Sequence, residues 1–142
     1  MSLITDLMKL PTELSTASKY TVANGIFYFL SGILFVAWPG LVQSSFHDYD
    51  FVGHEAALGR VIGLLLTIIG WLYIFGGRTG GRQFVAATVV DRIVFVPIVL
   101  VPLAISGAFP HVCISFAILD PVLAIGAWVI LNRTQRIEMS AE

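Results

Sequence analysis

Residues 84–105, which read FVAATVVDRIVFVPIVLVPLAI, form an almost wholly apolar segment with one adjacent pair of charges, Asp91 and Arg92. A helix that crosses the apolar core of a bilayer, about 30 Å thick, needs roughly 20 such residues. In lipid, a helix satisfies its own backbone hydrogen bonds, which an open strand cannot do. The segment therefore predicts a membrane-spanning helix that carries two charges at membrane depth.

Three further segments, residues 20–38, 58–75 and 112–131, have the same character, and each is followed by polar or helix-breaking residues. We therefore predict an all-α integral membrane protein, with one transmembrane domain over residues 1–142. Its four transmembrane helices are residues 20–38, 58–75, 84–105 and 112–131, and short links favour an up-down-up-down bundle. Residues 3–10 fit either an interfacial helix on the membrane surface or a frayed tail.

The composition supports this class of protein and excludes others. Apolar residues make up 57% of the chain and charged residues 12%, with a mean hydropathy of +0.89. Soluble domains average roughly 45–50% and 25%, so this chain has too few charges for a water-exposed surface. A net charge of −1 also gives no attraction for nucleic acid.

The basic residues predict the orientation. Two loops, residues 39–57 and 106–111, contain no lysine or arginine. The tails and the remaining loop contain basic residues, namely Lys9, Lys19, Arg78, Arg82, Arg133 and Arg136. By the positive-inside rule both termini are then cytoplasmic. We expect a multi-pass protein of a bacterial inner membrane, in contact with membrane lipids.

Small and polar residues indicate how the helices pack. Gly59 and Gly63 form a GxxxG pair, which is used either for tight packing within the monomer or for a homodimer. Polar residues also fall on stripes of their helices at helical spacing, which predicts that the stripes face a common axis. These stripes contain Asn24, Tyr28, Arg60, Thr67 and Asp120.

Four ionisable residues lie at predicted membrane depth: Arg60, Asp91, Arg92 and Asp120. A central charge costs about 2.5–3.5 kcal/mol on insertion scales, so such residues usually face the bundle interior and are paired. From their depths along the helices, we expect a direct Arg92–Asp120 ion pair, with Arg60 as a second partner of Asp120. Asp91 is expected to bond Thr88, or Asn24 and Tyr28.

This charge network has three possible roles: fixing the helix register, binding a ligand head group, or moving protons or ions. We favour a non-enzymatic protein that binds a lipid-like or amphiphilic ligand, or a partner membrane protein. In this hypothesis, Arg60 and Arg92 hold an anionic head group. The alternative is a small transporter or proton-conducting subunit, in which Asp91 or Asp120 titrates. Either could be a homo-oligomer, and neither implies a cofactor.

Other chemistry has weak support. The loop over residues 46–55 contains His47 and His54, which are possible metal ligands, but no recognised metal-binding spacing occurs. Cys113 is the only cysteine, so no intramolecular disulfide can form. The chain also lacks the nucleophile, P-loop and dinucleotide motifs of common enzymes. An enzyme that uses the loop histidines is therefore the weakest hypothesis.

Overall fold

The computed structural model describes residues 13–139, and side chains as far as Arg133. Its elements are α2 (Thr16–Ala37), α3 (Pro39–Ser45), α4 (Glu55–Arg78), α5 (Arg82–Val90), η1 (Asp91–Phe95), α6 (Val96–Ile105) and α7 (Pro110–Met139). The described residues form helices and connecting turns without strands, which confirms the predicted all-α class. The expected helix at residues 3–10 lies outside the described residues.

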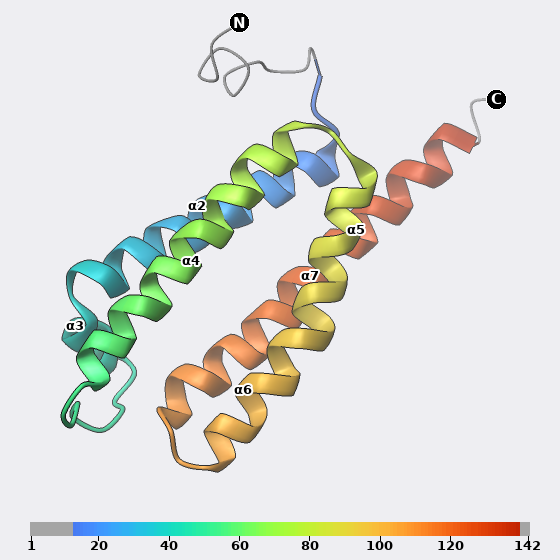
Figure 1. The fold of residues 1–142 in the computed structure, drawn as a ribbon. Helices are drawn as coiled ribbons and strands as arrows, with labels where there is room; N and C mark the ends of the chain where they lie inside the picture. Colours follow the sequence, from blue (N-terminus) through green and yellow to red (C-terminus); the bar gives the residue numbers. More distant parts are fainter. Residues whose placement is uncertain (1–12, 140–142) are drawn as a thin grey trace, which may run out of the picture.

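Four helical segments are long and apolar enough to cross a membrane: Thr16–Ala37, Glu55–Arg78, Arg82–Ile105 and Pro110–Arg133. They support a multi-pass membrane protein, and each begins two to four residues before the segment predicted from hydropathy. Consecutive spans run antiparallel, so the chain forms two helical hairpins, α2 with α4 and α5–η1–α6 with α7 (Figure 1).

Glycines bring α2 and α4 into close contact. A methyl group added to Gly25 would lie 2.7 Å from the backbone nitrogen of Ile74, and one added to Gly63 would lie 2.7 Å from that of Val36. Only a residue without a side chain fits at such crossings. Gly63 of the GxxxG pair is therefore used for packing within the chain, while Gly59 packs beside Pro39 of α3.

The helices of the two hairpins pack together at one end of the molecule, which we call the termini end because both described chain ends lie there (Figure 1). Small and branched side chains form a buried cluster at this end, made up of Ala17, Val85, Val89, Ala124, Ala127 and Leu131. At the opposite end, the loop end, the connection between α3 and α4 lies near the turn between α6 and α7. Between these ends the hairpins diverge.

The third span contains one turn of π-helix, η1, between α5 and α6. Its wider turn is closed by a hydrogen bond from the Val96 N–H to the Asp91 carbonyl oxygen. Pro97 follows directly and has no N–H, and in a regular α-helix its ring would crowd the carbonyl of Ile93. The π-turn relieves this clash. It contains one residue more than an α-helical turn, which changes the directions of the Asp91 and Arg92 side chains around the helix.

Candidate functional site

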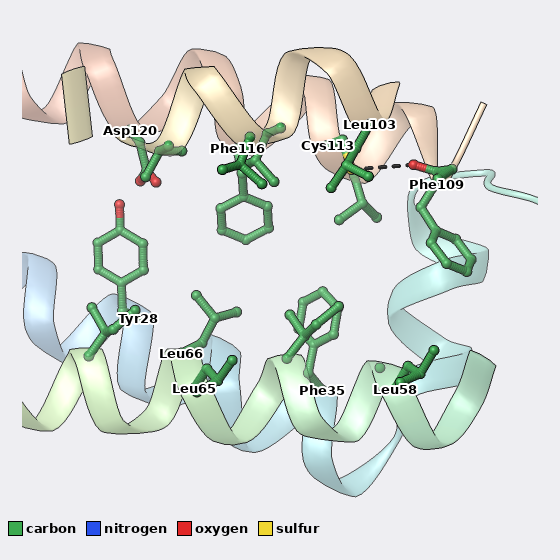
Figure 2. Close-up of a pocket in the computed structure, with 18 of the residues that line it drawn as sticks. Tyr28, Phe35, Leu58, Leu65, Leu66, Leu103, Phe109, Cys113, Phe116 and Asp120 are labelled. Carbon is green, nitrogen blue, oxygen red and sulfur yellow. Dashed lines mark hydrogen bonds between the residues drawn. The ribbon is translucent and has the colours of Figure 1, made fainter. Parts of the chain in front are cut away.

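A cavity of about 590 Å³ lies between the two hairpins. Figure 2 shows apolar side chains that project into it from both sides, with Leu65 and Leu66 on one side and Phe116 on the other. This volume falls within the range of about 300–1,000 Å³ typical of ligand pockets. The charged side chains that line it are Asp91, Arg92 and Asp120.

The cavity is not sealed on the side between α4 and α6. Lining residues of both helices keep large exposed surfaces, with Leu58 of α4 at 60% and Val99 of α6 at 55% exposed. The segments that bear these residues are among the spans apolar enough for a bilayer. This side of the cavity therefore presents an apolar opening.

Arg92 is the most unusual residue of the site. It is 1% exposed, and its guanidinium carbon lies 4.7 Å from the centre of the Tyr73 ring and 5.6 Å from that of Tyr28. These cation–π contacts compensate part of the cost of burying the charge. However, none of its three side-chain nitrogens has a hydrogen-bond partner among the described residues. A buried cation thus retains an unused set of hydrogen-bond donors.

Two further buried polar groups near Arg92 lack partners among residues 13–133: the Tyr28 hydroxyl and the Oδ1 atom of Asp120. They point toward one another across the cavity (Figure 2). Asp91, in contrast, accepts a hydrogen bond of 3.1 Å from the Tyr73 hydroxyl. The polar end of the cavity therefore offers free donors from Arg92 and Tyr28 and one free carboxylate oxygen.

This arrangement corrects part of the expected network. Arg92 and Asp120 are both buried and line one cavity, but the expected direct ion pair does not form, because neither the Arg92 nitrogens nor Oδ1 of Asp120 has a hydrogen-bond partner. Arg60 is exposed near the start of α4, does not line the cavity, and so is not a second partner. At that position, its long side chain can reach the interface.

The remaining predicted residues have other partners. Thr88 donates to the Val85 carbonyl, so it is not the partner expected for Asp91. Thr67 donates to the Gly63 carbonyl. Asn24 is buried, and its Nδ2 atom has no partner among the described residues. Sequence analysis did not identify Tyr73 as the partner of Asp91; this tyrosine is only 7% exposed.

Sequence analysis also missed Asp48, whose fully buried side chain closes the loop end. Its Oδ1 and Oδ2 atoms accept hydrogen bonds of 2.9 Å from the N–H groups of His111 and Val112. The imidazole Nδ1 atom of His111 lies 2.8 Å from Oδ1. Asp48 thus caps the first turn of α7 from the loop between α3 and α4. One signal was present, since Pro110 begins α7 without a capping residue before it.

The loop histidines do not assemble a metal centre with their neighbours. In the part of the chain that the structure describes, no three His, Cys, Asp or Glu side chains gather at one point. His47 and His54 are both exposed. We therefore propose no metal site at these residues.

Comparisons with known proteins add no family. No protein-family model matches the chain, and no match was found among curated proteins or solved structures. The functional argument consequently depends on the geometry of the cavity.

Proposed function

We propose that this protein binds an amphiphilic, lipid-like molecule, whose polar head lies at Arg92 and whose apolar tail fills the cavity. One observation carries the proposal. Arg92 is almost completely buried, has no hydrogen-bond acceptor among the described residues, and stands at the charged end of an otherwise apolar cavity.

The energetics favour an occupant over an empty site. A buried donor without an acceptor costs about 1–3 kcal/mol, and more when it is charged. A ligand oxygen at Arg92 would remove this cost, while a tail covering the cavity walls would bury apolar surface. Since Arg60 lies outside the site, Arg92 is the one basic residue, among those that the structure describes, that lines the cavity and would hold the head.

The opening between α4 and α6 suggests the route of entry. If these helices cross a bilayer, the exposed surfaces of Leu58 and Val99 face lipid. An amphiphile could then move sideways from the bilayer into the cavity without entering water. A bacterial inner membrane, with cytoplasmic termini and membrane lipids as partners, remains part of this proposal.

The test uses protein purified in a mild detergent and examined by native mass spectrometry. We expect wild-type protein to carry a bound amphiphile and Arg92→Gln to lose it, with occupancy reduced tenfold or more, because a hydrogen bond to a charged donor contributes about 1.5–3 kcal/mol. Arg60→Gln is the matched control, since it removes the same type of side chain from an exposed position. If Arg92→Gln and Arg60→Gln retain the ligand equally, Arg92 does not hold it.

A small transporter or proton-conducting subunit is the second candidate, and the observation that favours it is the unpartnered, buried Oδ1 of Asp120. The transporter hypothesis predicts that wild-type protein in proteoliposomes supports a flux of protons or substrate and that Asp120→Asn abolishes this flux. Absence of flux in wild-type protein that carries a bound amphiphile would favour a binding protein. A partner membrane protein or a second copy in place of the ligand would appear as added protein mass in the same spectra.

A further inference from the structure

We infer that the ligand's head group is uncharged and carries a hydroxyl oxygen, a step that rests on the proposed binding function. It replaces the anionic head group expected from the sequence. The basis is the balance of charges and hydrogen-bonding atoms at the polar end of the cavity.

The charge balance disfavours an anion. One positive side chain, Arg92, and two carboxylates, Asp91 and Asp120, line the cavity. The site therefore has a formal excess of negative charge before any ligand enters. The second arginine that would have balanced this excess, Arg60, is exposed and does not line the cavity. With both carboxylates ionised, an anionic head would be attracted by Arg92 but repelled by Asp91 and Asp120, in surroundings where charges are poorly screened.

The hydrogen-bonding atoms disfavour a quaternary ammonium head. Such a head offers no acceptor, so it would leave the Arg92 nitrogens and the Tyr28 hydroxyl without partners. It would also add a second positive charge beside the guanidinium. Asp120 would attract a quaternary ammonium head, but the Arg92 nitrogens and the Tyr28 hydroxyl would remain without hydrogen-bond partners.

A hydroxyl group matches both requirements. Its oxygen accepts up to two hydrogen bonds and its proton donates one. Accepting from Arg92 and donating to Oδ1 of Asp120 would give partners to atoms on both sides that now have none. Long-chain alcohols, monoacylglycerols and quinols share this chemistry, together with an apolar tail suited to the cavity.

The experiment compares three probes with the same tail: hexadecan-1-ol, hexadecyl sulfate and hexadecyltrimethylammonium. Binding to delipidated wild-type protein is measured by native mass spectrometry at equal mole fractions in maltoside micelles. We expect the alcohol to bind at least threefold more tightly than either charged probe. A smaller preference, or tighter binding of a charged probe, overturns the inference.

A second variant tests the cause of this selectivity. Asp120→Asn removes one negative charge from the site and should narrow the preference for alcohol over sulfate several-fold, whereas the exposed loop variant Asp50→Asn should leave it unchanged. An unchanged preference in Asp120→Asn contradicts the charge argument. If no probe binds to wild-type protein and no amphiphile co-purifies, the proposed function itself fails. The two failures are therefore distinguishable.

Discussion

Replacing Asp48 with Ala should destabilise the protein by about 3 kcal/mol, because it removes the cap that joins the loop end to α7. The carboxylate accepts two backbone hydrogen bonds of 2.9 Å, from His111 and Val112, and its side chain is fully buried. Hydrogen bonds to charged groups contribute about 1.5–3 kcal/mol each, so two such bonds give about 3 kcal/mol at the lower limit. The additional contact with the His111 ring makes this a conservative value.

The measurement is an equilibrium unfolding titration with sodium dodecyl sulfate in mixed micelles, followed by far-ultraviolet circular dichroism. Asp50→Ala is the matched control, because it removes an exposed carboxylate from the same loop. We expect Asp48→Asn to be less harmful than Asp48→Ala, since an amide oxygen can still accept one of the bonds. Equal unfolding free energies for Asp48→Ala and Asp50→Ala would refute the capping role.

Three further predictions concern the third span, the helix crossing and the orientation. Pro97→Ala restores the missing N–H, so the π-turn should revert to α-helix and the Arg92 guanidinium should rotate out of the cavity. The amount of bound amphiphile, measured by native mass spectrometry, should then fall several-fold, and an unchanged amount would contradict this role of Pro97. Gly25→Ala places a methyl group 2.7 Å from a backbone nitrogen of α4 and should lower the free energy of unfolding by about 1–3 kcal/mol. Gly40→Ala is the control, because a methyl group at that position has no neighbouring atom within 4 Å. Thr79→Cys, in a Cys113→Ala background, should react with an impermeant thiol reagent only after cells are opened; labelling of intact cells would reverse the predicted orientation.

The four spans could be predicted because apolar length is a local property of the sequence. The same segments also showed which charges would be costly, and Arg92 and Asp120 are indeed buried. Their pairing could not be predicted, because it depends on the direction of each side chain around its helix. The regular rotation of an α-helix does not hold through η1, where the π-turn adds a residue to the register.

Asp48 illustrates a different limit. Its partners, His111 and Val112, lie 63 and 64 positions further along the chain. Hydropathy and local spacing contain no information about a contact over that distance. The uncapped start of α7 indicated that a partner was needed, but the fold had to be known before the partner could be identified.

The division into two helical hairpins has a consequence for how the protein is made. Only residues 79–81 connect α4 to α5, and Gly80 adopts the left-handed backbone conformation there. Each half already contains its own antiparallel helix pair, so each can enter the bilayer during synthesis before the other is complete. The halves would then dock as finished pieces, and a gene split at this connection should still yield a working protein when both fragments are co-expressed.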